Sequence, residues 1–257
     1  MNFFTIEKLQ KQLVEIRQAV YRAILPIPQF KFREADPPGA AFPRFDDSDW
    51  ADFRVGDFWG GYDVVAWFRA WLTIPEAWRD GKVYLRLLVG PRDGGDSTAE
   101  TLVYVNGEPL QGIDIWHEEA WLPPEVVQRG QVHLALRAWS GVLGVPDRRR
   151  FRLAQLALID EPTERFFYLS DTLIRAIVEL AEGDLRRLHL MDSLNRAFLK
   201  LDWTRPGSPA FYQSVAEAER QLRADMERLY EVAEIKPHVV GIGHAHIDMA
   251  WLWRKES

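Results

Sequence analysis

Residues 101–110 read TLVYVNGEPL, and they hold the clearest folding signal in the sequence. Tyr104 and Val105 are residue types typical of strands. Asn106 and Gly107 follow them directly, and Asn-Gly is the dipeptide that best predicts a two-residue turn with positive φ angles. The stretch therefore predicts a strand that ends in a tight turn.

Similar runs occur on both sides of this stretch, with Gly and Pro residues between them. Short runs at this spacing are typical of an antiparallel β-sandwich, and we expect one over residues 29–162. The clearest additional strands are AWFRAWLTIP (66–75), GKVYLRLLVG (81–90), QVHLALRAWS (131–140) and FRLAQLALID (151–160).

The sequence changes to a helical period at both ends of this domain. Apolar residues from Ile6 to Ile24 recur every three or four positions, which predicts one N-terminal helix within residues 1–28. Residues 163–236 contain three further helical patterns, and Ser208–Pro209 marks the start of the last one. This second region predicts a helical spacer.

Composition excludes several function classes. The chain has 257 residues, a formal net charge of -6 and no cysteine. We expect no nucleic-acid partner, because a mildly acidic chain does not attract polyanions. Disulfides and thiolate metal sites are impossible. The N-terminus has no apolar run of the signal-peptide type, and no run is long enough for a membrane span, so we expect a cytoplasmic protein that makes no contact with membrane.

The last segment, residues 237–257, differs from everything before it. Its apolar run HVVGIG (238–243) is typical of a buried strand, and the side chains of His244, His246 and Asp248 follow at once. Residues two apart on an extended chain point the same way, so these three side chains can converge on one ion. Without cysteine, nitrogen and oxygen ligands of this kind suit a catalytic Zn²⁺.

Spacing alone leaves two enzyme classes open, because amidohydrolase-like metal hydrolases also begin with a His-x-His motif. The tail separates them: HAHIDMAWLW (244–253) resembles the opening motif of glycoside hydrolase family 38 α-mannosidases. The resemblance implies that His246 and Asp248 bind zinc and that Trp251 stacks on the mannose ring. It also places His244 beside the metal ligands, where it would orient them.

The upstream region shows a second resemblance. The order WFRAWLTIP, VYLRLLV, VYVNGEPL, WHEEAWLP and VHLALRAW is similar to that of a galactose-binding-like jelly roll. An order of helix, sandwich and helical spacer is also similar to the N-terminal extension of cytosolic and bacterial family members. Residues 237–257 would then be the first strand of an α/β barrel that the sequence cuts short.

The resemblance implies a retaining, zinc-dependent enzyme that hydrolyses terminal α-mannosides of oligosaccharides. Its nucleophilic Asp and its remaining zinc ligands would lie downstream of Ser257. We therefore expect no catalytic residue in this chain and no activity from it alone. A homo-oligomer is possible. Two alternatives stay open: a metal hydrolase of amidohydrolase type, and a glycan-binding sandwich that uses Trp59, Trp116 or Trp121 as a stacking surface.

Overall fold

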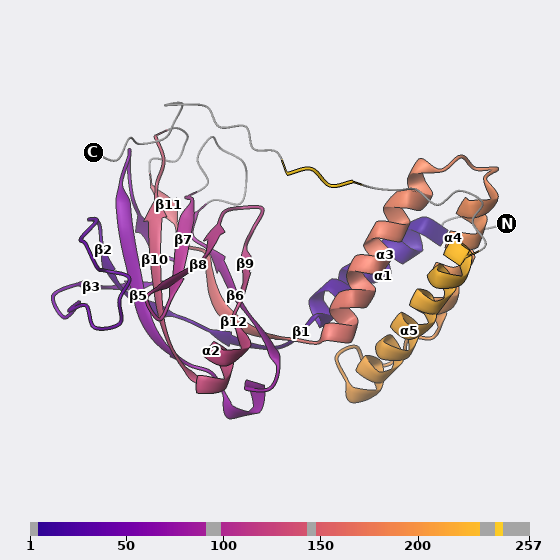
Figure 1. Cartoon of the computed structure of the whole chain (residues 1–257), viewed down its shortest axis with the longest axis horizontal. Coiled ribbons are helices and arrows are strands. Elements are labelled where there is room, and N and C mark those ends of the chain that lie inside the picture. Colours follow the sequence, from indigo (N-terminus) through magenta and orange to yellow (C-terminus); the bar gives the residue numbers. More distant parts are fainter. Residues whose placement is uncertain (1–4, 91–98, 143–147, 232–239, 244–257) are drawn as a thin grey trace. The chain divides into compact units, whose positions relative to one another are not determined.

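A computed structural model describes residues 5–90, 99–142, 148–231 and 240–243. The chain divides into two compact units. One comprises Arg17–Glu164, and the other comprises Met1–Ile16 together with Arg165–Ser257. The first unit is built from strands and the second from helices (Figure 1).

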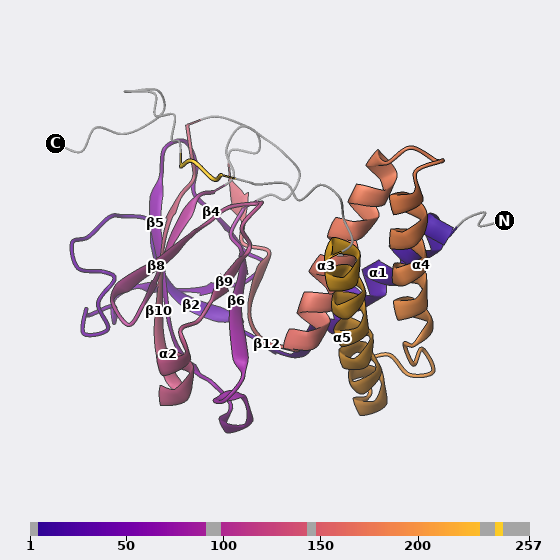
Figure 2. The same ribbon diagram turned by 45° about the vertical axis from the view of Figure 1, so that its right-hand side comes forward.

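The strand unit is an antiparallel β-sandwich, as the sequence predicts (Figures 1 and 2). A four-stranded sheet has the order β1 (Tyr21–Pro26), β12 (Leu153–Ile159), β6 (Lys82–Leu88), β9 (Glu119–Trp121). A six-stranded sheet has the order β3 (Ala51–Arg54), β2 (Gln29–Arg33), β5 (Val65–Thr73), β10 (Gln131–Trp139), β7 (Thr101–Val105), β8 (Glu108–Ile113). The short strands β4 (Phe58–Trp59) and β11 (Arg149–Arg150) form a third pair, and the turns carry η1 (Glu76–Trp78) and α2 (Pro124–Arg129).

The core lies between the two large sheets. Side chains alternate along each strand, so β10 directs Val132, Leu134 and Leu136 inward, where each is at most 1% exposed. Phenylalanine rings fill the centre, and Phe68 makes edge contacts with Phe53 and Phe151 at ring separations of 5.0 and 5.1 Å. The alternation leaves a second, outward-facing row of side chains on β5 and β10.

The predicted tight turn between β7 and β8 is confirmed. Asn106 has φ 54° and Gly107 has φ 95°, which is the positive-φ pair that a two-residue hairpin turn requires. The Asn106 side chain also accepts a hydrogen bond of 2.9 Å from the backbone N–H of His133 on β10. The turn therefore ties the hairpin to the neighbouring strand.

One prediction is wrong at the N-terminus. The helix α1 (Thr5–Ala19) ends before the expected residue 24, and Tyr21–Pro26 form strand β1 instead. The backbone of this segment pairs antiparallel with β12, from Tyr21↔Ile159 to Pro26↔Gln155. That ladder satisfies backbone groups that a longer helix would satisfy alone, so pairing across the sheet overrides the helical spacing of Ile24.

The helical unit contains most of α1 and the three predicted spacer helices, α3 (Glu161–Glu179), α4 (Leu185–Leu199) and α5 (Pro209–Glu231). Ser208 Oγ accepts a hydrogen bond of 3.2 Å from the N–H of Phe211, which caps α5 as its Ser-Pro start predicts. In the described part of the chain, no helix combines the length and apolar composition needed to cross a membrane.

The hairpin turn gives a direct stability test. Substituting Gly107→Ala places a Cβ 2.9 Å from Phe42 Cδ1 at φ 95°, so we expect a loss of about 1–2 kcal/mol or more in the free energy of unfolding. Gly112→Ala on β8 is the control, since its Cβ would meet nothing within 4 Å. Urea unfolding of both variants measures the two losses in free energy. Equal midpoints would contradict the described turn.

Candidate functional site on the outer face of the six-stranded sheet

The metal motif predicted from the sequence lies outside the described residues. This applies to His244, His246, Asp248 and Trp251, whose proposed roles the structure therefore does not test. Within the described ranges, no three His, Asp or Glu side chains come together as a metal site. A candidate site within the described residues must therefore come from the surface and buried polar groups of the two units.

The three tryptophans proposed as a stacking surface differ in exposure. Trp59 is 0% exposed and donates an indole hydrogen bond of 2.9 Å to the carbonyl of Val89, so its role as a stacking surface is wrong. It belongs to the core because β4 turns its side chain against Phe68. Trp116 and Trp121 are 81% and 53% exposed and remain accessible.

A covering loop lies on the outer face of the six-stranded sheet, the face turned away from the four-stranded sheet. We use this name for residues 34–50, which connect β2 to β3. Ala40, Ala41 and Trp50 of this loop pack with Trp67 and Ala135 of the sheet, and all five are at most 8% exposed. The loop buries the part of the outer face on which it lies.

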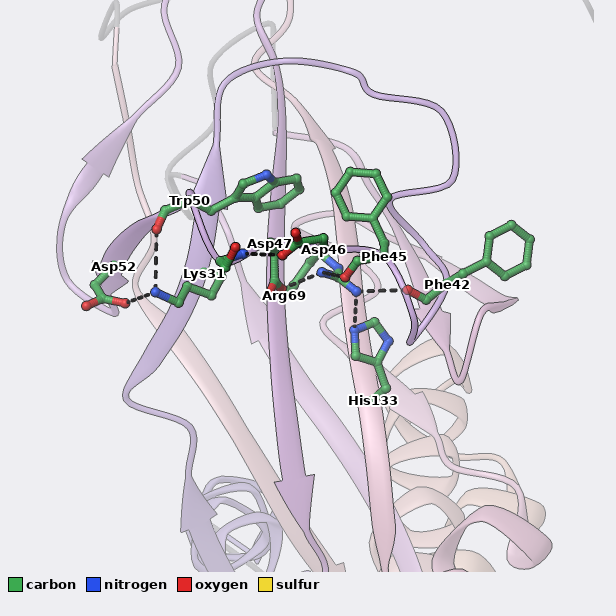
Figure 3. A network of polar contacts seen from close by, with 10 residues as sticks. Lys31, Phe42, Phe45, Asp46, Asp47, Trp50, Asp52, Arg69 and His133 are labelled. Carbon is green, nitrogen blue, oxygen red and sulfur yellow. Dashed lines mark hydrogen bonds and ion pairs between the residues drawn. The ribbon is translucent and has the colours of Figure 1, made fainter.

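Arg69 joins the covering loop to the sheet (Figure 3). Its side chain is buried on β5, and its guanidinium donates hydrogen bonds to the carbonyls of Phe42 at 2.8 Å and Phe45 at 3.2 Å. It also forms a salt bridge with Asp47. Burial lowers the pKa of Arg69, and Asp47 offsets part of that effect. The result is one cation that binds three points of one loop.

His133 completes this network from β10. Its Nε2 lies 3.0 Å from Nη2 of Arg69, and since guanidinium nitrogens only donate, Nε2 must be the acceptor. Burial and, to a smaller extent, the charge of Arg69 lower the pKa of His133 to about 4, although Asp47 opposes the shift. The imidazole is therefore neutral, with its proton on Nδ1, which has no hydrogen-bond partner within the described residues.

Beyond the covering loop, the outer face carries the exposed side chain of Trp71. This residue stands opposite His133 in the β5–β10 register, and its indole packs edge-on against the imidazole at 5.1 Å. It is 59% exposed. A cavity of about 290 Å³ adjoins it, lined by Leu25–Gln29, Ala70–Thr73 and Leu156. One edge of the sandwich thus combines an exposed aromatic ring with a hollow.

The four-stranded sheet carries a polar cluster on its own outer face. Glu164 accepts hydrogen bonds from Lys82 at 2.6 Å and from Tyr84 at 2.8 Å. Burial raises the pKa of Tyr84, and the hydrogen bond and negative charge of Glu164 add to that effect. Nearby, Glu119 pairs with Arg86 at 3.1 Å and with the hydroxyl of Tyr21. These carboxylates are already neutralised by partners, which is typical of structural ion pairs.

The sequence alone did not point to Arg69, His133 or Trp71 as site residues. The signal was available in part, because strict alternation along β5 puts Trp67, Arg69 and Trp71 on one face, opposite the core residues Ala66 and Phe68. Nothing in the order of residues shows that a loop covers the first two and leaves the third exposed.

Comparison with known proteins identifies this sandwich. The family model described as the Ams1-like α-mannosidase jelly roll domain matches residues 29–158, about half of the chain. The chain belongs to this α-mannosidase family. The resemblance to the N-terminal region of a glycoside hydrolase family 38 enzyme is confirmed with it.

Two relatives match most of the chain. Human α-mannosidase 2C1 is 28% identical over 223 residues, which cover 79% of this chain and 20% of the relative. The mouse protein of the same name is 26% identical over 216 residues, covering 78% and 19%. The chain thus spans about a fifth of the length of these relatives. Among solved structures, a β-glucuronidase of Bacteroides uniformis matches 52% of this chain and 18% of its own, at 18% identity and a TM-score of 0.44.

Two of the salt bridges that join the covering loop to the sheet, those of Arg69 and Arg33, should differ in strength. Arg69→Met leaves Asp47 and two carbonyls without their donor, so we expect a loss of about 3–5 kcal/mol in unfolding free energy. Arg33→Met removes an exposed pair with Asp49 and should cost less than about 1 kcal/mol. Chemical unfolding measures both. Similar losses would contradict the role given to Arg69.

His133 predicts a pH dependence of stability. Its folded pKa of about 4 lies below the unfolded value near ~6.5, so the unfolded chain binds more protons between these limits. The unfolding free energy should therefore fall as the pH drops from about 6.5 to 4, by up to about 3 kcal/mol from this group. His133→Gln should flatten the profile in that window. Parallel profiles for the two proteins would refute a buried neutral imidazole.

Proposed function

We propose that this chain is the N-terminal scaffold of a zinc-dependent, retaining α-mannosidase that hydrolyses terminal α-mannosides. One observation carries the proposal: the α-mannosidase jelly roll family matches residues 29–158 of a chain that continues into HAHIDMAWLW at 244–253. The relatives named α-mannosidase 2C1 support the same substrate class. The sandwich and helices would then support chemistry that takes place elsewhere.

The proposed chemistry rests on the motif. His246 and Asp248 would be two of the zinc ligands, His244 would hold them in orientation by hydrogen bonding, and Trp251 would stack on the sugar ring. When bound, zinc would position the sugar hydroxyls and stabilise charge rather than generate hydroxide. No cysteine lies within these 257 residues, so the ligands that this chain would contribute are nitrogen and oxygen donors.

The described carboxylates support a scaffold role for the sandwich. Retaining glycosidases need two carboxyl groups about 5–5.5 Å apart that flank the substrate. The buried carboxylates of the strand unit are occupied instead: Asp160 pairs with Arg22 at 3.1 Å, and Glu164 pairs with Lys82 at 2.6 Å. We therefore propose that the nucleophile lies downstream of Ser257 and that the 257-residue chain alone is inactive.

Two further expectations stay predictions. A cytoplasmic location follows from the sequence argument alone, and so does the possibility of a homo-oligomer. Neither affects the assignment of the motif residues.

Hydrolysis of an aryl α-mannoside by the intact gene product tests the proposal. We expect release that stops on chelation and returns with zinc, and none from the 257-residue chain. His246→Ala should lower activity at least ~100-fold and reduce the bound zinc, since even partners of metal ligands cost 10–100-fold. His117→Ala is the matched control, because His117 is an exposed histidine whose side-chain partner is Asp114.

Three results would contradict the proposal in different ways. Turnover by the 257-residue chain would refute its inactivity. Equal zinc content in the His246→Ala and wild-type proteins would refute the ligand assignment. Amide cleavage without glycoside cleavage by the intact product would favour a hydrolase of amidohydrolase type.

A further inference from the structure

Trp71 differs from the other exposed tryptophans of the sandwich in how it is held. It lies within a nine-residue strand whose backbone pairs with β10 along its whole length. Trp116 is in the loop between β8 and β9, and Trp121 is the last residue of the three-residue strand β9. A ring on a regular strand loses less freedom when a ligand binds it than a ring on a loop does.

Contacts with buried side chains also hold the ring of Trp71 in place. The His133 imidazole packs edge-on against it at 5.1 Å, and His133 is in turn held by Arg69 at 3.0 Å. Arg69 is anchored by the covering loop, as Figure 3 shows. The indole therefore rests on a chain of buried contacts while 59% of its surface faces outward.

The residues that line the cavity beside Trp71 are uncharged, and some of them can form hydrogen bonds. Gln29 and Thr73 are exposed and line the adjoining cavity, and the exposed Gln131 stands opposite Thr73 in the β5–β10 register. None of the residues that line the cavity is charged. Amide and hydroxyl groups beside an aromatic face match a pyranose ring, which has an apolar C–H face and hydroxyls around its rim.

The backbone at this edge adds further hydrogen-bonding groups. Ile74 N–H donates to Gly130 beside β10, so by alternation the backbone groups of Thr73 and Trp71 point to the opposite side. The registered pairing of β5 with β2 ends at Lys31↔Arg69, short of both. Pro26 and Pro28, which line the same cavity, have no N–H. The backbone groups of Trp71 and Thr73 on this side of β5 are therefore placed where ligand hydroxyls could form hydrogen bonds with them.

The size of the cavity limits the ligand. Its volume of about 290 Å³ lies just below the ~300–1,000 Å³ typical of small-molecule sites. A cavity of this size favours a small saccharide over a long glycan chain. The absence of charge from its lining favours a neutral sugar over a uronic acid or a sugar phosphate.

We propose that Trp71, Gln29 and Thr73 form a carbohydrate-binding subsite for neutral pyranosides on the jelly roll, apart from the metal motif. The choice of mannosides as ligands rests on the proposed function, but the site itself does not. Binding here would hold a glycan on the scaffold rather than cleave it.

Sugar binding to the full 257-residue chain tests the subsite. Methyl α-mannoside and an α-linked mannobiose are titrated to tens of millimolar, with saturation-transfer NMR and calorimetry as readouts. We expect saturable binding that weakens at least tenfold in Trp71→Ala, partly recovers in Trp71→Phe and weakens in Gln29→Ala. Glucuronic acid should bind more weakly than the neutral sugars.

Matched variants separate this site from other aromatic surfaces. Trp116→Ala and Trp121→Ala remove rings that are 81% and 53% exposed, and they should leave binding unchanged. Circular dichroism confirms that each variant is folded, which is expected for Trp71→Ala because its ring is largely exposed. Absence of saturable binding, or binding that Trp71→Ala leaves intact, would overturn the proposal.

The outcome is independent of the hydrolysis assay. Trp71-dependent binding by a protein whose intact form cleaves no mannoside would uphold the subsite and refute the proposed function. Chelator-sensitive hydrolysis without sugar binding by the 257-residue chain would refute the subsite alone.

Discussion

The burial of Arg69 is the interaction on which the outer face of the sandwich depends. A guanidinium keeps its charge in proteins, so removing it from water requires acceptors in place. The covering loop supplies them: two carbonyls and the carboxylate of Asp47. These acceptors hold the loop against the sheet at Arg69, and the apolar loop residues Ala40, Ala41 and Trp50 are buried against the same face.

Two features of the surface follow from that constraint. Arg69 occupies the acceptor nitrogen of His133, which together with burial keeps the imidazole neutral and in one orientation. The loop also ends its cover at Arg69, which leaves Trp71 exposed on the next outward position of β5. A single buried cation thus separates a sealed part of the sheet from an open one. The hairpin turn is coupled to the same loop, because a Cβ at Gly107 would meet Phe42.

Much of the fold follows from local sequence signals, because those signals act over a few residues. Asn106–Gly107 predicts its turn by φ preference alone, and Ser208–Pro209 predicts the start of α5 by capping. Strand β1 was missed because its helical spacing is local while its partner, β12, is more than a hundred residues away. A short stretch of sequence cannot reveal a strand pairing between residues so far apart.

The site was less predictable than the fold. Tryptophan content suggested a sugar-stacking surface, but composition does not say which ring is buried, and Trp59 proved to be core. Arg69 and Trp71 differ in exposure because of a loop whose position depends on contacts between distant residues. The metal motif stays a prediction from its residues alone, because residues 244–257 lie outside the described ranges.

Hydrogen exchange of the full chain, compared between wild type and Arg69→Met, tests the central claim most directly. Our account predicts that amides of residues 34–50 lose protection in the variant while those of the paired strands β5 and β10 retain it. Unchanged protection of residues 34–50 would show that the loop does not depend on Arg69, and the claim would be wrong.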